Sequence, residues 1–316
     1  MPSNPSQLSA DHFVADLEET PIRAVDAIDE SEKPRSSWTD AWDSMRVRPL
    51  FWISGVLIIL VILVAVFPGI FTHVDPKANS LDNSNASPRA GHPFGYTFQG
   101  YDVYARVIVG TRASLTVGIL ATLICTALGI IIGALAGYYG GWLDAVVSRI
   151  GDIFFSIPTV LGAIVIMTTI QDRTPLSVAI ILAIFAWPQV ARQMRGAVIS
   201  AAATDYVMAS TALGVSRFRI LVRHVLPNAI NPVIVIATVS LGTFIVAEST
   251  LSFLGIGLGD GAISWGGDIS SAQTYLRTAP LPLLWPAIAL SITVLSFLMM
   301  GDVVRDALDP KARARR

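Results

Sequence analysis

Long hydrophobic stretches, separated by shorter polar segments, follow one another from residue 50 onward. An α-helix needs about 20 apolar residues to cross the hydrocarbon core of a bilayer. Six stretches approach that length, at residues 50–67, 113–137, 153–170, 175–191, 229–247 and 281–300. The pattern predicts an all-α integral membrane protein with a bundle of six transmembrane helices. The third helix is open to an earlier start near Leu143, and the short fourth stretch leaves a re-entrant segment as the alternative.

The polar segments divide the chain further. Residues 1–35 are acidic and poor in large apolar side chains, so we expect a disordered tail. They lack the basic start and early apolar core of a signal peptide. Residues 36–110 hold the first span and a polar segment after it, with Trp38 and Trp42 placed to begin a short interfacial helix. Residues 111–310 form the transmembrane core with a loop at 201–228, and residues 311–316 are a basic tail.

The distribution of basic residues along the chain indicates the orientation of the six spans. With both termini in the cytoplasm, 16 of the 22 lysines and arginines lie on the cytoplasmic side and 6 lie outside. An excess of Lys and Arg in cytoplasmic loops is the usual topology signal. We therefore expect cytoplasmic termini, a cytoplasmic loop at 201–228 and external segments at 71–112 and 252–280.

Composition agrees with a membrane protein and excludes other classes. The chain is 53% hydrophobic and 14% charged, with a mean hydropathy of +0.61, whereas soluble domains carry about 25% charged residues. A net charge of −1 gives no basic field for nucleic acid, and one cysteine, Cys125, excludes an internal disulfide. Gly129, Gly133 and Gly137 share one helix face, which predicts close packing against a neighbouring helix.

The loop at 201–228 reads as two short helices that meet at a corner. Thr204 is a candidate N-cap, the first helix runs to Leu213, and Gly214 stands where a left-handed C-terminal cap falls. Ser216 can begin the second helix, which Pro227 is expected to stop.

One apolar stripe lies on the first of these helices. Tyr206, Ala209 and Leu213 recur at helical spacing on a loop that we place outside the bilayer. The stripe needs a cover, which is either a partner protein or this chain's own helices, and the pattern alone leaves both open.

The same loop closely resembles the conserved cytoplasmic loop of ATP-binding-cassette importer permeases: a helix of small residues, a glycine, then a hydrophobic helix ending in Leu226-Pro227. The resemblance extends over about residues 45–310. It is also carried by stretches at 137–144, 149–158, 247–257, 264–266 and 301–310. These stretches are similar to the C-type permease of dipeptide and oligopeptide importers, in the peptide and nickel subfamily. One external stretch, 94–102, departs from the family pattern, because Tyr101 stands where the family has arginine.

The resemblance implies the six-helix fold of a type I importer permease in the plasma membrane of a prokaryote. It further implies a second homologous permease, one or two ATPase subunits and an extracytoplasmic substrate-binding protein as partners. In the family this loop docks on the ATPase. The residues of this sequence that we assign to ATPase coupling are Asp205, Tyr206, Ala209, Leu213, Gly214, Arg217 and Pro227.

The chain carries no site for its own energy source. A phosphate-binding loop needs lysine after glycine, and no lysine here follows glycine. The four histidines are not spaced as metal ligands, and no nucleophile–base motif occurs. We therefore expect a permease that is not an enzyme and binds no cofactor or metal, with ATP and Mg used by the partner ATPase. An ion-coupled secondary transporter is the alternative of another class; an intramembrane enzyme is a more remote one.

Three residues are candidates for the pathway or its gate. Glu248 is an ionisable residue at membrane depth, where such residues are costly and often functional; a structural carboxylate is the alternative, and the one we favour. Asp260 and Trp265 lie in a glycine-rich external stretch that is either a plain loop, a re-entrant gate or a docking surface. Subfamily resemblance favours short peptides as cargo, with haem, nickel chelates and glutathione as alternatives.

Overall fold

The computed structural model describes residues 37–259 and 261–308, and the expected tails at 1–35 and 311–316, with Asp260, lie outside this part. The chain divides into two compact units, Met1–Asp40 and Ala41–Arg316. The first contains four described residues, so the fold is that of the second unit. Its regular elements in the described part are helices, with isolated β-bridges in the segment 79–102.

Five helices are long and apolar enough to cross a membrane: α2 (Pro49–Val66), α4 (Val103–Tyr139), α7 (Pro175–Ala202), α11 (Asn231–Phe253) and α13 (Leu281–Leu308). They confirm five of the six predicted spans, but four of these helices continue well beyond the predicted ends. Polar residues extend α7, for example, because Arg192 and Arg195 pair with Asp152 and Asp144 of a neighbouring helix. The re-entrant alternative for α7 is wrong, since it is one helix of 28 residues that begins with a Thr174–Ser177 capping box.

The predicted third span is broken. Residues 153–170 are divided between α5 (Gly141–Ser156) and α6 (Thr159–Met167), which are bent by 83° to each other. Ile157 is extended, as expected before proline, and Pro158 starts the next helix. A single continuous helix is therefore wrong here, although helix does begin before Leu143. The described part has five spans, or six if the bent pair crosses together.

The closest helix pair is α4 and α7, and glycine makes it possible. A Cβ atom added to Gly129 would lie 2.4 Å from the Val190 Cβ, and one added to Gly133 would lie 2.3 Å from the Ala191 carbonyl oxygen. At Gly137 the Arg195 carbonyl oxygen is 2.8 Å away. The structure confirms the predicted glycine face.

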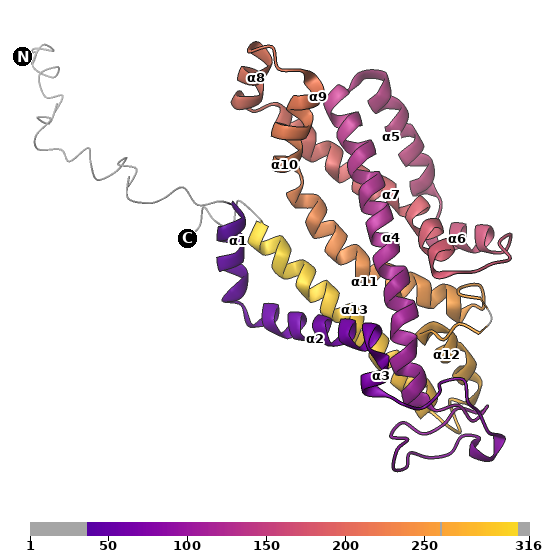
Figure 1. Cartoon of the computed structure of the whole chain (residues 1–316). Helices are drawn as coiled ribbons and strands as arrows, with labels where there is room; N and C mark the ends of the chain where they lie inside the picture. Colours follow the sequence, from indigo (N-terminus) through magenta and orange to yellow (C-terminus); the bar gives the residue numbers. More distant parts are fainter. Residues whose placement is uncertain (1–36, 260, 309–316) are drawn as a thin grey trace, which may run out of the picture. The chain divides into compact units, whose positions relative to one another are not determined.

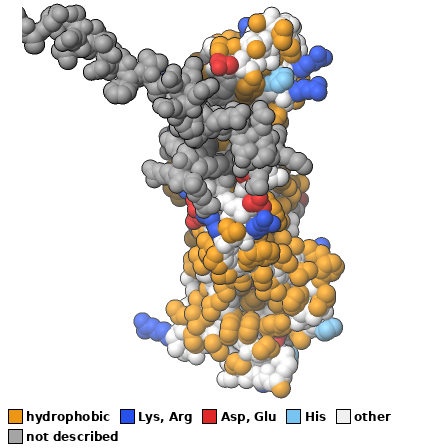
Figure 2. Space-filling view, turned by 90° about the vertical axis from the view of Figure 1, so that its left-hand side faces the viewer, with side chains coloured by type: hydrophobic (Ala, Val, Ile, Leu, Met, Phe, Trp, Pro, Cys, Tyr) orange, Lys and Arg blue, Asp and Glu red, His pale blue; other side chains and the backbone are white. Residues whose placement is uncertain are grey.

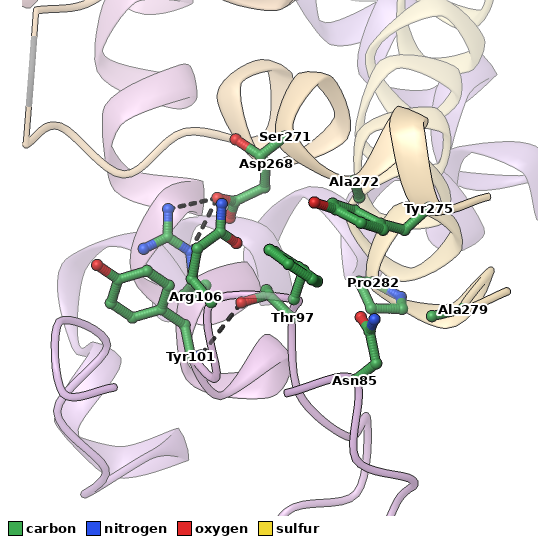
Figure 3. A pocket seen from close by; sticks show the side chains of 12 residues that line it. Asn85, Thr97, Tyr101, Arg106, Asp268, Ser271, Ala272, Tyr275, Ala279 and Pro282 are labelled. Atoms are coloured by element: carbon green, nitrogen blue, oxygen red, sulfur yellow. Dashed lines mark hydrogen bonds and ion pairs between the residues drawn. The ribbon is translucent and has the colours of Figure 1, made fainter. Parts of the chain in front are cut away.

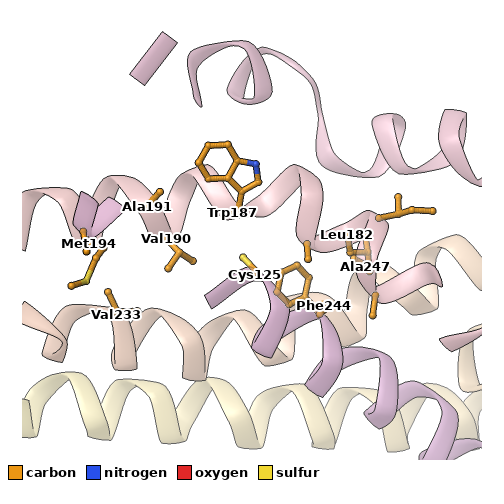
Figure 4. Close-up of a cluster of buried hydrophobic side chains, with 14 of the residues drawn as sticks. Cys125, Leu182, Trp187, Val190, Ala191, Met194, Val233, Phe244 and Ala247 are labelled. Carbon is orange, nitrogen blue, oxygen red and sulfur yellow. The ribbon is translucent and has the colours of Figure 1, made fainter. Parts of the chain in front are cut away.

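A buried apolar core surrounds this contact between α4 and α7. Figure 4 shows Cys125 of α4 among side chains of α7 and α11, and the cluster includes Leu182, Trp187, Val190, Ala191, Met194, Val233, Phe244 and Ala247. Helix α11 also packs on α13, and α2 packs on α13 and α4. One end of α13 contacts Ala41 of α1 (Ser37–Arg46), which is the short helix expected around Trp42.

Helix α2 turns a hydrophobic face outward. Trp52, Ile53, Val56 and Ile59 are each more than half exposed. Figure 2 shows a broad apolar surface on this side of the molecule, with charged side chains above and below it. Because so large an apolar surface is unfavourable in water, this face is suited to lipid.

The connections lie at the two ends of the long helices (Figure 1). At one end are α8 (Asp205–Ala212), α9 (Arg217–Ile220), the π-helical turn η4 (Leu221–Val225) and α10 (Leu226–Ala229). At the other are α3 (Pro68–Phe71), η3 (Leu81–Asn83), α12 (Trp265–Ala272) and η5 (Gln273–Tyr275).

The α4–α7 contact predicts that Gly133→Ala destabilises the protein while Gly196→Ala does not. The first methyl group meets the α7 backbone, and overpacking of this kind costs about 1–3 kcal/mol. The second substitution is also helical but has nothing within 4 Å of the added Cβ. Thermal unfolding in detergent, followed by labelling of buried Cys125 with a thiol-reactive dye, measures both. Equal melting temperatures for the two variants would contradict the role of this contact.

Candidate functional site

The loop between α7 and α11 is built around Gly214. Its φ of +79° is the left-handed conformation that favours glycine. The Gly214 N–H donates to the Thr211 carbonyl and the Val215 N–H donates to the Ser210 carbonyl, the two bonds of a Schellman cap. The predicted corner between two short helices is therefore confirmed, and its angle is held by backbone hydrogen bonds.

Three details of the expected loop differ. Helix α8 ends at Ala212 rather than Leu213, which is its C-cap. The Thr204 hydroxyl bonds back to the Ala201 carbonyl and does not cap α8. Pro227 does not stop the second helix, because the wide π turn η4 precedes it and α10 continues to Ala229. A π turn accommodates the missing proline N–H within a continuing helix.

The apolar stripe of α8 is exposed. Leu213 is 83% exposed and Tyr206 is 44% exposed, and Ala209 lies on the same open surface. The loop buries different side chains in the core, namely Val207, Ile220, Leu221 and Val225. The alternative that the stripe packs on this chain's own helices is therefore wrong. Asp205 and Arg217 are also exposed at this end.

A groove of about 490 Å³ opens where α5 breaks from α6. Phe155 and Pro158 line it at the break, and α7, α11 and α13 supply the other walls. Most of its surface is apolar, with polar groups from Gln189, Ser240, Thr243 and Arg305. Sequence reasoning missed this groove, because its residues come from distant segments. Pro158, inside the third predicted stretch, is the sequence signal that marks the break.

Glu248 is fully buried near the end of α11, away from the groove lining. The Ser252 hydroxyl donates to its carboxylate at 2.7 Å, and the Ser249 hydroxyl is 3.3 Å from it. Ser114 of α4 and Ser264 lie near the same carboxyl. The two hydroxyl groups of α11 thus solvate the buried carboxylate from its own helix, an arrangement that fits the structural role.

Trp265 is also buried, and its indole N–H donates to the Val107 carbonyl at 3.0 Å. The bond fastens α12 to α4. Beside it, Gly266 packs so closely on Ser249 that an added Cβ would lie 2.3 Å from the Ser249 carbonyl oxygen. The structure thus places Trp265 in the contact between helices, while Asp260 lies outside the described residues.

A second, small pocket of about 50 Å³ lies at the same end of the molecule (Figure 3). Arg106 of α4 forms an ion pair with Asp268 of α12, with the guanidinium Nε donating at 2.8 Å. Burial raises the pKa of the Asp268 carboxyl, whereas the charge of Arg106 and its hydrogen bond act in the opposite direction. The ring of Tyr101 faces the Arg106 guanidinium at 4.9 Å. The Tyr101 ring thus packs against the guanidinium that pairs with Asp268.

No cluster of three or more His, Cys, Asp or Glu side chains suited to a metal occurs among the residues that the structure describes.

Two family models match the sequence. Residues 129–314 match the binding-protein-dependent transport system inner membrane component, and residues 36–88 match the N-terminal TM domain of oligopeptide transport permease C.

Curated relatives cover most of the chain. The oligopeptide transport system permease protein OppC of Bacillus subtilis is 34% identical over 94% of this chain and 97% of its own length. The dipeptide transport system permease protein DppC of Alkalihalophilus pseudofirmus is 35% identical, covering 88% and 91%. The glutathione transport system permease protein GsiD of Escherichia coli O6:K15:H31 is 35% identical, covering 89% and 93%.

A solved structure supports the fold. A chain of the inward-facing MetNI methionine ABC transporter superposes with a TM-score of 0.53 at 20% identity, covering 65% of this chain and 96% of that one. Together with the five long apolar helices and the exposed loop, these matches identify a multi-pass membrane protein: the chain belongs to the family of binding-protein-dependent transport system inner membrane components.

Proposed function

We propose that this chain is the permease subunit of an ATP-binding-cassette importer that moves short peptides across the cytoplasmic membrane. Separate ATPase subunits supply the energy, and ATP and Mg are bound there rather than by this chain. The observation that carries the proposal is the exposed apolar stripe of α8, presented on a rigid corner at one end of the long helices. Such a surface needs a protein partner. The relatives are named as permease proteins of oligopeptide and dipeptide transport systems, in which a permease works with other subunits.

The loop is built to pass a displacement into the helices. The exposed side of α8 meets the ATPase, while Val207 on its other side lies in the core. The Schellman cap at Gly214 keeps α8 and α9 at a fixed angle, so that a push on one turns the other. From α9 the chain continues through η4 and α10 directly into α11. Asp205, Arg217 and Pro227 lie between the start of α8 and the end of α10, and we assign them to the coupling loop because of that position.

The groove at the α5–α6 break is the half of the pathway that this chain provides. Its hydrogen-bonding side chains, Gln189, Ser240 and Thr243, can meet the polar backbone of a peptide, and its apolar walls accept varied side chains. A second homologous permease closes the groove from the other side. Access that alternates between the two membrane faces then follows from relative movement of the two subunits.

The positive-inside pattern supports the orientation. Arg217 and Arg219 of α9 and Arg223 of η4 are basic residues at this end, so we place it in the cytoplasm. The end with α12 then faces outward, toward an extracytoplasmic substrate-binding protein.

Deletion of the gene tests the cargo. We expect uptake of labelled peptides of two to four residues to fall to background and to return when the gene is supplied. Uptake of haem, a nickel chelate and glutathione should be unchanged in the same strain. Unchanged peptide uptake with loss of one of these three would replace the proposed cargo by that compound.

Leu213→Glu should abolish retention of the ATPase subunits during purification and leave the permease inserted and folded. A charge in the centre of an apolar contact is costly when the contact is made and harmless while the residue faces water. Leu81→Glu is the matched control, because Leu81 is 72% exposed at the opposite end of the long helices. Normal ATPase retention by Leu213→Glu would remove α8 from the interface.

The corner at Gly214 is tested by a pair of substitutions. Nothing lies within 4 Å of an added Cβ, so only the backbone conformation limits the choice of residue. Gly214→Val should uncouple ATP hydrolysis from uptake, because the left-handed conformation costs a non-glycine residue about 1–2 kcal/mol and a β-branched one most. Gly214→Asn should keep most transport, since asparagine visits this conformation readily. Equal transport by the two variants would show that the corner angle has no role.

A further inference from the structure

The groove at the α5–α6 break continues toward the end of α11 that meets α10. A cavity of about 420 Å³ lies there between α7, α10, α11 and α13. Ile236 of α11 and Arg305 of α13 line both the groove and this cavity, so the two spaces border on the same two side chains. We call the combined space the α11 cleft. It follows α11 from Pro232 to Ala247, which is about 22 Å of helix at 1.5 Å per residue.

Several polar side chains of the α11 cleft are not engaged by the protein. The following form no hydrogen bond or ion pair with any other residue in the part of the chain that the structure describes: Gln189, Gln193, Asn231, Ser240 and Arg305. The arginines of α7 behave differently, because Arg192 and Arg195 are both paired with acids of α5. Polar groups left open on a cavity are available to a ligand that brings complementary groups.

The charge of the α11 cleft is positive. Arg305 is the one charged residue among the described residues that line it. The neighbouring acids of α13 do not neutralise this guanidinium: Asp306 pairs with Arg48 at 2.5 Å, and the exposed Asp302 lines neither space and forms no ion pair with Arg305 within the described part. The cleft therefore favours an anionic group at the point where its two parts meet.

We propose that Arg305 binds the carboxylate of the cargo on its way along α11. A guanidinium presents two parallel N–H groups that match the two oxygen atoms of a carboxylate. Because no acid of this chain competes for these donors, a carboxylate that enters the cleft gains a charged hydrogen bond without displacing an existing one. Arg305 thus selects for cargo with a free carboxylate.

The spacing along α11 suits a short peptide held in this way. Ser240 lies one helical turn from Ile236, which borders on Arg305 at the junction, and one turn is about 5.4 Å. A fully extended dipeptide spans about 7 Å. A peptide with its carboxylate on Arg305 therefore has its backbone alongside Ser240, within the part of the cleft that Gln189 also lines.

The inference rests on the proposed function, because a carboxylate site in this position serves transport only if the chain is a permease. It does not depend on peptides being the cargo, since glutathione and haem also carry carboxylates. A small carboxylate used as a probe therefore tests Arg305 separately from the nature of the cargo.

The test uses the complete membrane complex, with both permeases and the ATPase subunits, in nanodiscs of phosphatidylcholine, which contain no anionic lipid. Saturation-transfer NMR measures the binding of propionate against propionamide, a neutral molecule of nearly the same shape. We expect propionate to bind more tightly than propionamide. Equal binding of the two would overturn the proposal, and so would absence of propionate binding, which would indicate that an acid of another subunit occupies the guanidinium.

Arg305→Gln assigns the binding to this side chain. The substitution removes a charged hydrogen-bond donor, so we expect propionate to bind about tenfold more weakly and propionamide to be unaffected. Arg305→Lys keeps the charge and should restore most of the binding, which a merely structural role of the guanidinium would not produce. Arg277→Gln is the matched control, because Arg277 is also exposed but follows η5 and lines neither space. Unchanged affinity for propionate in Arg305→Gln would sink the proposal.

Competition relates the site to the cargo. Displacement of propionate by alanylalanine but not by alanylalanine amide assigns the guanidinium to the carboxyl terminus of a peptide. Displacement by neither peptide, with the dependence on Arg305 intact, would keep the carboxylate site and refute peptides as the cargo. Equal displacement by both peptides would show recognition that does not involve the carboxylate, and would contradict the proposal.

Discussion

The backbone contact between α4 and α7 is the constraint on which the other features depend. Within a bilayer no hydrophobic effect drives helices together, so association relies on close packing. Gly133 and Gly137 let the α4 backbone reach the carbonyl groups of Ala191 and Arg195, and Gly129 makes room for the Val190 side chain. Because α4 runs from the pocket at Arg106 to the end that carries the α8–α9 loop, this one contact sets the relative position of both ends.

Charge pairs complete the same helix contact where the apolar stretch ends. Arg195 binds Asp144 of α5 through two nitrogen atoms, with Nη2 donating at 2.6 Å, and Arg192 reaches Asp152 about two turns further along α5. These pairs hold α5 beside α7. Beyond the bend at Pro158, α6 packs on α7 in another way, since a Cβ atom added to Gly162 would lie 2.5 Å from the Phe185 ring. The groove opens at this bend, where Phe155, Pro158 and Phe185 line it.

These observations explain which features could be predicted from the sequence. The length of the hydrophobic stretches located α2, α4, α7, α11 and α13, because a helix needs about 20 apolar residues to cross a bilayer. Their ends could not be predicted, because residues such as Arg195 and Asp102 extend a helix only through partners that the sequence does not place: Asp144 for the first, and the N–H of Ala105 and the ring of His92 for the second.

The local motif at Gly214 was predictable for the opposite reason. A left-handed cap is decided by four or five consecutive residues, so the corner could be located without knowledge of the rest of the fold. The stripe on α8 was visible too, but its exposure depends on which other helices approach, and none of those described covers it. The pocket in Figure 3 is lined by Asn85 and Asp268, which are far apart along the chain.

Helix α11 gives the two ends a direct mechanical connection. It begins beside α10, where the loop enters the bundle, and its one proline, Pro232, lies in the first turn, where a missing N–H does not weaken the helix. At its far end Glu248 and Ser249 hold the start of α12, and the Phe253 carbonyl accepts a hydrogen bond from Ser270. A helix without an internal break moves as a rod, so a tilt imposed at α10 must displace α12 unless the α4–α7 pair yields. Since α4 also carries Arg106, the Arg106–Asp268 pair ties α12 to α4 as well as to α11.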